Sequence, residues 1–466
     1  MTTDRSILGS LVAAFDGLSI PSQIEEALAG GLGGVVLLAR NVETHDQLRE
    51  VTDAIHCHNP QALVMVDEEG GAVSRLDRVT GGGFPSAQAL GFIDDPDLTR
   101  ELAAIRGGYL RACGVDLCLA PVADLRRQPE NPVVGSRSFG EDSELVARHV
   151  KATVVGTRLA GVAACVKHFP GHGATDADSH ESWATAAASE AAIRRDHLIP
   201  FRTAVDAGVE AVMPGHIVVP EWDARPASIS SKALVLLRAE LSFDGLIVSD
   251  AVDMAGVGSG VEVATADAIA AGADLILLGN REPDQETIES IVASIRDALA
   301  DGFLSRERLR EAAYRRAAFG RPPVTAEVRL EDRRAEAARR AISWHGEAIR
   351  GPSRVRTVVV ARPSWTRGLE IDDNVTDSVR AAFPAARVVV DGEELASDAD
   401  LIVTNDSAFD PTQVVLVARI RSTKPSTLVA ETGLLAGELT PPVVQLRGAS
   451  ELSMLALARE LEGTSP

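Results

Sequence analysis

The chain has 466 residues, of which 45% are hydrophobic and 24% charged, as is usual for a soluble globular protein. Its 67 Asp and Glu outnumber its 46 Lys and Arg, and the net charge of −21 disfavours nucleic acid and anionic membrane as partners. The sequence contains no apolar run of about eighteen residues and no secretory leader, so we expect a cytoplasmic protein. Four cysteines without the paired spacing of a metal site are expected to be reduced core residues: Cys57, Cys113, Cys118 and Cys165.

Apolar runs rich in β-branched residues recur along the first part of the chain, with stretches between them that suit helices. The runs cover residues 8–15, 34–38, 62–66, 115–120, 162–166, 209–213, 246–248 and 273–278. Two of the intervening stretches, 144–160 and 190–207, are long enough for crossover helices. Eight such units predict a (β/α)₈ barrel of the TIM type rather than a doubly wound sheet.

A barrel of this type gathers the residues that follow each strand at one mouth. The predicted strands are followed by Asp16, Arg40-Asn41, Asp67-Glu68-Glu69, Pro121 with Asp124, Lys167-His168, Pro214 with His216, and Ser249-Asp250. Asp and Asn often begin loops in any protein, so some of these polar residues are expected only to form turns. The polar residues that turn formation does not explain indicate a functional site at the mouth.

Residues 166–180 hold three of the ten histidines. Lys167 and His168 are placed at the end of a buried strand, and a loop follows. Within that loop, Asp178 and His180 have i, i+2 spacing, which in extended backbone puts both side chains on one face. The carboxylate can then fix the tautomer of the imidazole, which is the arrangement of a general acid/base.

From about Arg321 the pattern changes. A Pro-Pro pair is followed by a predicted charged helix over 330–350, and new strands are expected at 356–361, 387–390, 399–404, 427–430 and 443–446, with an amphipathic closing helix over 454–461. We therefore predict a catalytic barrel over 1–325, a helical linker over 326–352 and a small α/β domain over 353–466.

The motif KHFPGHG at 167–173, followed by Asp178-Ser-His180, resembles family 3 of the glycoside hydrolases, and more narrowly its β-N-acetylglucosaminidase branch. Asp67-x-Glu-Gly-Gly71, residues 131–140 and Ser249-Asp250 extend the resemblance across the barrel. Many members carry a second Asp after the nucleophile, where this chain has Ala251. The small C-terminal domain resembles a shortened form of the second domain of many relatives.

The resemblance implies that Asp250 is the nucleophile and that His180, oriented by Asp178, is the acid/base. It also implies substrate contacts from Asp67, Arg75, Arg137, Lys167, His168, Met213 and His216. Arg75 alternates with apolar neighbours, which also suits a surface position. A histidine suits proton transfer because its ordinary pKa is near ~6.5. Neither a metal nor a cofactor is expected.

The predicted function is a retaining, exo-acting β-N-acetylglucosaminidase that cleaves terminal β-linked N-acetylglucosamine from small glycans or cell-wall fragments through a glycosyl-enzyme. One alternative is a phosphorylase that uses the same residues with phosphate as acceptor, which product analysis with and without phosphate distinguishes. Less favoured are a metal-dependent hydrolase, with ligands drawn from His168, His172, Asp178 and His180, and a non-catalytic sugar-binding protein.

Overall fold

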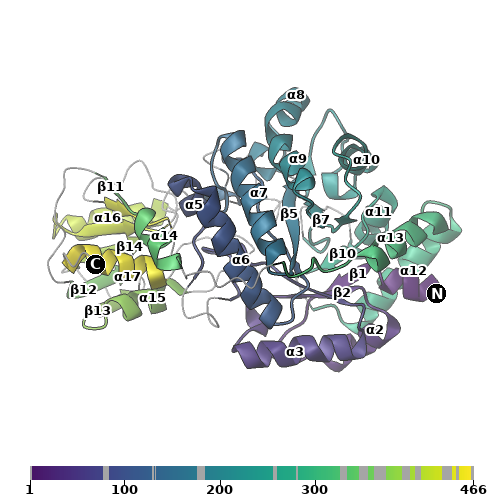
Figure 1. Ribbon diagram of the computed structural model, residues 1–466, viewed down its shortest axis with the longest axis horizontal. Helices are drawn as coiled ribbons and strands as arrows, with labels where there is room; N and C mark the ends of the chain where they lie inside the picture. The colour runs from purple at the N-terminus through teal and green to yellow at the C-terminus, as the bar shows by residue number, and fades with distance from the viewer. Residues whose placement is uncertain are drawn as a thin grey trace.

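The computed structural model describes residues 3–76, 83–127, 131, 133–175, 184–254, 260–279, 282–325, 333–345, 355–361, 374–390, 399–404, 411–432, 443–447 and 451–462. Figure 1 shows a larger part that contains the N-terminus and a smaller part that contains the C-terminus. The two parts meet beside helix α5 (Ala87–Ile93).

The larger part is built on eight parallel strands. They are β1 (Leu11–Ala13), β2 (Gly34–Leu37), β3 (Leu63–Val66), β4 (Leu117–Cys118), β5 (Ala163–Phe169), β7 (Ala211–Pro214), β9 (Leu246–Ile247) and β10 (Ile276–Leu278). Their order is β10-β1-β2-β3-β4-β5-β7-β9, and a parallel bridge between Val248 and Leu275 joins the two ends. Each predicted run overlaps one of these strands, so the barrel prediction is confirmed.

Helices surround this sheet. They are α1 (Thr3–Leu8), α2 (Ser22–Gly30), α3 (His45–His58), α5, α6 (Pro96–Ala112), α7 (Ser143–Leu159), α8 (Glu190–Ala192), α9 (Leu198–Asp206), α10 (Ser231–Glu240), α11 (Val261–Ala271), α12 (Gln285–Ala300) and α13 (Arg306–Ala318). A π-helical turn, Ile193–His197, joins α8 to α9. Side-chain oxygens of Thr44, Ser86, Asp95, Asp142, Ser189, Ser230, Asp284 and Ser305 accept backbone N–H groups where their helices begin. Such caps explain why these helices start where they do.

Short elements at the barrel mouth complete this part. They are the 3₁₀ turns Ala39–Asn41, Gly135–Arg137, His172–Ala174 and Ala227–Ile229, and a two-stranded sheet of β6 (Ala184–Thr185) and β8 (Ile217–Val218).

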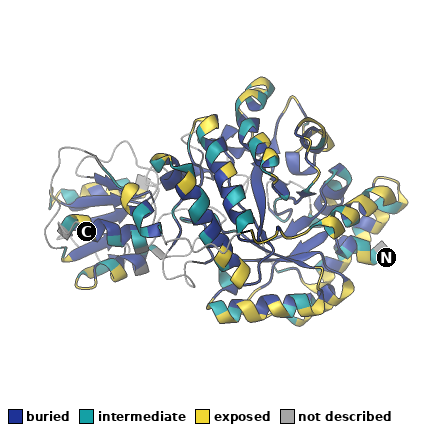
Figure 2. Cartoon of the chain, viewed as in Figure 1, coloured by how far each residue is buried: buried dark blue, intermediate teal, exposed yellow. Residues whose placement is uncertain are grey.

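The strands are buried on both faces. Alternate residues fill the barrel interior, as Val12, Met65, Leu117 and Cys165 do, while their neighbours pack outward against the helices. Figure 2 shows this as dark blue strands beneath helices that are yellow on their outer faces. Because the interior is filled by apolar side chains, polar chemistry is confined to the mouth.

All four cysteines are free thiols, but Cys57 is exposed. The expectation that it lies in the core is wrong because α3 buries the stripe Leu48, Val51, Thr52 and Ile55, and Cys57 falls outside that stripe. None of the described helices combines the length and apolar character that crossing a bilayer requires.

The smaller part is an α/β domain with one six-stranded sheet. Its strands are β11 (Ser343–His345), β12 (Thr357–Val360), β13 (Arg387–Val390), β14 (Leu401–Thr404), β15 (Leu428–Glu431) and β16 (Val443–Gln445), in the order β11-β16-β15-β14-β12-β13. Only β11 is antiparallel to its neighbour among these strands. Its helices are α14 (Arg334–Arg340), α15 (Asn374–Ala382), α16 (Pro411–Arg421) and α17 (Glu451–Glu462). The predicted small domain and its closing helix are confirmed.

The helix predicted over 330–350 is wrong in extent. Among the described residues 333–345, only α14 is helical, and β11 follows it and pairs with β16. The chain turns here because Ile342 packs against the apolar core of the small domain rather than continuing the helix. The domain boundaries at 325 and 352 remain a prediction, although β11 adds a strand from the predicted linker to the second sheet.

Two adjacent glycines in α6 report on how closely α6 and α7 pack. A Cβ atom on Gly107 would lie 2.7 Å from Ala160 Cβ, whereas one on Gly108 would have no neighbour within 4 Å. We predict that Gly108→Ala stabilises the barrel by about 0.5–1 kcal/mol through helix propensity. Gly107→Ala gains the same helix propensity, but it should lower the free energy of unfolding by about 1–3 kcal/mol because the added methyl group overpacks the contact between α6 and α7.

Denaturant unfolding of the two variants measures this difference, since each serves as the control for the other. Equal midpoint denaturant concentrations for the two variants would contradict the close contact between α6 and α7.

Candidate active site

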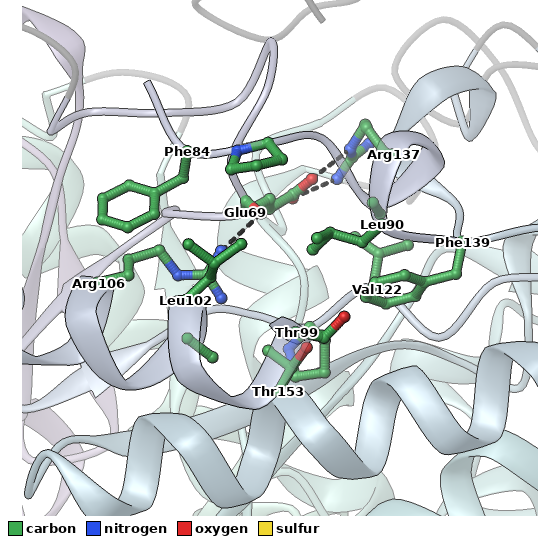
Figure 3. Close-up of a pocket in the computed structure, with 14 residues that line it drawn as sticks. Glu69, Phe84, Leu90, Thr99, Leu102, Arg106, Val122, Arg137, Phe139 and Thr153 are labelled. Carbon is green, nitrogen blue, oxygen red and sulfur yellow. Dashed lines mark hydrogen bonds and ion pairs between the residues drawn. The ribbon is translucent and has the colours of Figure 1, made fainter. Parts of the chain in front are cut away.

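Four charged side chains from three segments meet at the barrel mouth. Lys167 Nζ, at the end of β5, lies 2.5 Å from Asp67 Oδ1 and 2.7 Å from Glu69 Oε1. Arg137, from a 3₁₀ turn, holds both oxygens of Glu69, with Nη2–Oε1 2.7 Å and Nε–Oε2 2.8 Å. Figure 3 shows the paired Glu69 and Arg137. We call Asp67, Glu69, Arg137 and Lys167 the charged cluster; it contains two cations and two carboxylates.

The charged cluster is buried. The side chains of Lys167, Arg137 and Glu69 are 3%, 4% and 5% exposed, and only Asp67, at 18%, is more open. Burial alone would raise the pKa of Glu69, but the charges of Arg137 and Lys167 outweigh it and hold that pKa well below its usual range. Burial would lower the pKa of Lys167, and Asp67 and Glu69 instead raise it. The net shift favours the ionised form of both side chains.

His168 is oriented by a fully buried carboxylate. Its Nδ1 lies 2.7 Å from Asp124 Oδ2, so Nδ1 carries the proton in that hydrogen bond. Nε2 faces Arg137 Nη2 at 3.5 Å. Burial opposes ionisation of Asp124, but His168 and the backbone N–H of His172 hold its pKa below its usual value. Asp124 therefore fixes the ring of His168 toward the charged cluster.

The start of the loop after β5 is tied to the segment that carries Arg137. His172 N–H donates to Asp124 Oδ1 at 2.6 Å. Asn131 Nδ2 donates to the carbonyl oxygens of His172, at 3.0 Å, and Thr175, at 2.9 Å. Its Oδ1 accepts from the backbone of Val133 at 2.9 Å. The side-chain amide of Asn131 thus connects the loop after β5 with the segment that carries Arg137.

Arg75 is only 3% exposed, so a surface position is excluded. Its backbone N–H donates to Glu68 Oε2 at 2.7 Å, and the same oxygen accepts from Ser74 Oγ and from the Leu76 N–H, both at 3.0 Å. The buried Glu68 carboxylate shapes the turn after Gly70 and Gly71. A substrate contact by Arg75 remains a prediction.

Asp250 follows β9 at the same mouth. Its N–H donates to Pro214 O at 3.2 Å, and its Oδ1 accepts from the Ala251 N–H at 2.9 Å. His216 is fully buried, with Nδ1 2.7 Å from Ser228 Oγ, and its Nε2 donates to Ala251 O at 2.8 Å. His216 therefore holds the backbone next to Asp250. Its predicted role as a substrate contact stays a prediction.

Met213 is 3% exposed and packs within the barrel interior, and its predicted substrate contact also stays a prediction. Asp178 and His180 lie outside the described residues. The chain on either side of them is fixed, because an antiparallel bridge joins Thr175 to Ala186 and Ala187 N–H donates to Ala174 O at 2.9 Å. The segment that carries the predicted acid/base thus starts and ends at adjacent points of the mouth.

Comparison with known proteins assigns the family. The model of the glycosyl hydrolase family 3 N-terminal domain matches residues 17–318. The chain belongs to glycosyl hydrolase family 3. A Pseudomonas aeruginosa protein named Beta-hexosaminidase is 37% identical over 324 residues, which cover 68% of this chain and 95% of that protein. A Chromobacterium violaceum protein of the same name is 38% identical over 56% of this chain and 76% of its own length.

Solved structures agree with this assignment. A family 3 β-N-acetylglucosaminidase from Paenibacillus superposes over 99% of this chain and 97% of its own, with a TM-score of 0.83 and 26% identity. A structure titled as a β-glucoside phosphorylase has a TM-score of 0.75 but only 19% identity, which shows a shared fold alone. This family 3 member is a glycoside hydrolase.

Sequence reasoning placed Lys167, His168, Arg137 and Asp67 in one site, and the structure brings these four together. It did not assign Glu69 or Asp124, although both follow predicted strands. Glu69 lies within the Asp67–Gly71 motif, and that motif is the sequence signal that could have identified it. Its pairing with Arg137 joins positions 68 residues apart, a contact that sequence spacing does not reveal.

The buried His172 makes the stability of the family 3 barrel depend on pH. Burial lowers its pKa to about 4, although Asp124 favours the protonated ring. In the unfolded chain the ring binds a proton at about pH 6.5, so between pH 6.5 and 4 only the unfolded state is protonated. The free energy of unfolding should therefore fall by about 3 kcal/mol across that window, and be unaffected by this group above it.

Denaturant unfolding at pH 7.0, 5.5 and 4.5 checks this expectation by comparing the wild type with His172→Gln. The variant should be less stable at pH 7.0 but should lose less stability on acidification. Parallel pH curves for the two proteins would contradict it.

Proposed function

We propose that the protein is a retaining, exo-acting β-N-acetylglucosaminidase that removes terminal β-linked N-acetylglucosamine through a glycosyl-enzyme on Asp250. The observation that carries this proposal is the buried charged cluster at the mouth of the barrel that bears Asp250. Relatives named Beta-hexosaminidase and a Paenibacillus structure titled β-N-acetylglucosaminidase support the same chemistry.

The charged cluster suits a sugar with several hydroxyl groups. Asp67, its most open member, can accept hydrogen bonds from hydroxyls, while Lys167 and Arg137 present donors that their carboxylate partners hold in place. A substrate that lacks a matching oxygen leaves buried polar groups unpaired, which costs about 1–3 kcal/mol per group. We infer that the site discriminates by hydrogen bonds, and that the acetamido group is among the groups that it recognises.

The proposed mechanism has two steps. Asp250 Oδ attacks the anomeric carbon while the imidazolium of His180 protonates the departing glycosidic oxygen. Water then attacks the same carbon, His180 takes its proton, and the Asp250 carboxylate leaves with overall retention of configuration. Asp178 orients His180 and stabilises its charge, as the carboxylate does in other His-based acid/base pairs.

Water is the acceptor in this proposal, because the relatives of higher identity are named as hexosaminidases and the phosphorylase likeness concerns the fold alone. We propose further that the natural substrates include cell-wall fragments and that the enzyme works in the cytoplasm. The support is the resemblance of the KHFPGHG and Asp178-Ser-His180 motifs to the branch of the family whose cytoplasmic members act on such fragments.

Replacing the nucleophile tests the proposal most simply. Asp250→Ala should lose nearly all turnover of an aryl β-N-acetylglucosaminide while the fold is kept, because no glycosyl-enzyme can form. Asp244→Ala is the matched control, since Asp244 is exposed and precedes the same strand at its opposite end. If Asp250→Ala keeps more than about a tenth of the wild-type kcat, another group is the nucleophile.

The acid/base assignment predicts a dependence on the leaving group. His180→Ala should impair substrates with poor leaving groups most, because a nitrophenolate departs without a proton and an alkoxide does not. Asp178→Ala should show the same trend more weakly, since the imidazole remains. The rate constants of both variants on a series of aryl glycosides measure this. A loss that is independent of leaving-group pKa would assign His180 a structural role only.

A further inference from the structure

Helix α5 lies between the C-terminal domain and the charged cluster. Ser86, which caps α5, donates from Oγ to the carbonyl oxygen of Arg447 at 2.5 Å. The Arg447 guanidinium lies over the ring of Phe92, with its Cζ 3.5 Å from the ring centroid. In Figure 1, α5 is the barrel helix that borders α14 and the second sheet. The C-terminal domain therefore holds α5 at its first turn and on its outer face.

Arg447 is held firmly within its own domain. It follows β16, is 8% exposed, and donates from Nη1 to Ala341 O at 2.7 Å. Its backbone has a φ of 55°, an αL conformation that is uncommon outside glycine. A second contact supports the first, because Arg334 of α14 lies over the Phe84 ring at 5.1 Å. Arg447 thus meets an aromatic ring of α5, and Arg334 meets one shortly before the helix begins.

The inner side of α5 and the residues before it contact the segments that carry the cluster. Gly71 N–H donates to Phe84 O at 2.9 Å, and a Cβ atom on Gly71 would lie 2.6 Å from Ser86 Cβ. Gly71 is two residues after Glu69. At the other end of α5, Gly91 packs directly on the backbone of Phe139, two residues after Arg137. Displacement of α5 would thus shift both members of the Glu69–Arg137 pair.

Empty space lies beneath α5. A small cavity of about 20 Å³, room for about one water molecule, is lined by Glu69, Arg137, Phe84, Leu90 and Phe139 among others (Figure 3). Glu69 and Arg137 line it while Asp67 and Lys167 do not, so the cavity adjoins the charged cluster on the side of α5. Close packing is what normally fixes a helix on a core, and a void removes contacts on that side. The contacts with the C-terminal domain on the outer face of α5 add to its packing on the inner side.

We propose that Arg447 is a positioning residue for substrate binding: the C-terminal domain holds α5 through Arg447, and α5 sets the place of Glu69 and Arg137. This inference rests on the proposed function of the charged cluster as the sugar site. The Pseudomonas relative is matched over 95% of its length by 68% of this chain, so the chemistry itself does not need the second domain. The expected effect is therefore on substrate affinity rather than on the chemical step.

The test compares full-length Arg447→Gly, Phe92→Ala and the double variant. Glycine accepts the φ of 55° and keeps the carbonyl acceptor for Ser86, so only the side chain is lost. Arg421→Ala is the matched control, since Arg421 is in the same domain and its Nε bonds Thr427 O at 3.0 Å within that domain. Two quantities are measured: KM and kcat on an aryl β-N-acetylglucosaminide, and hydrogen exchange of the α5 amides.

Each single variant should raise KM by about threefold to tenfold with kcat within about twofold, and should speed exchange in α5. The double variant should have the same KM and the same exchange in α5 as the single variants, because each single variant already removes the contact between Arg447 and Phe92. Arg421→Ala should change neither quantity. Wild-type KM and wild-type exchange in α5 for Phe92→Ala overturn the inference, even if Arg447→Gly fails to fold. If the wild type does not turn over the substrate, the proposed function fails, while exchange in α5 still decides the positioning role.

Discussion

The buried Glu69 carboxylate, shared by Lys167 and Arg137, is the interaction on which the mouth of this barrel depends. It joins three segments that are distant in sequence: the turn after β3, the end of β5 and the 3₁₀ turn at 135–137. Removing one partner of a buried ion pair typically costs about 3–5 kcal/mol, because the remaining charge stays desolvated. We propose that the same charges hold sugar-binding groups in fixed positions, so that the stability of the mouth and its recognition of substrate have one physical origin.

Buried groups around the charged cluster fix the structure of the barrel mouth. Asp124 binds the His168 ring and the His172 N–H, and Asn131 ties the loop after β5 to the loop that carries Arg137. His216 holds Ala251, next to the proposed nucleophile. The donors and acceptors of the site are thereby oriented before substrate arrives, which is the condition for electrostatic stabilisation of a developing charge.

The sequence predicted the barrel strands because a strand buried on both faces leaves a continuous apolar run, and all eight runs overlap a strand. It also predicted one site for Asp67, Arg137, Lys167 and His168, which the structure brings together, while their catalytic and binding roles stay predictions. It did not predict the pairing of Glu69 with Arg137 or of Asp124 with His168, since these depend on how loops fold across the mouth. The helix predicted over 330–350 ends early because Ile342 packs into the second core, a tertiary effect that charge patterning does not reveal. The contact of Arg447 with Phe92 likewise joins two domains and leaves no local pattern.

We propose a two-step displacement at Asp250, in a site where the charged cluster holds the sugar. A displacement through a glycosyl-enzyme retains the anomeric configuration, whereas direct attack by water inverts it. Proton NMR of the sugar first released from an aryl β-N-acetylglucosaminide, recorded before mutarotation, measures this directly. With Asp250 as the nucleophile, β-N-acetylglucosamine should appear first and the α-anomer should grow in later; initial release of the α-anomer would contradict the two-step displacement.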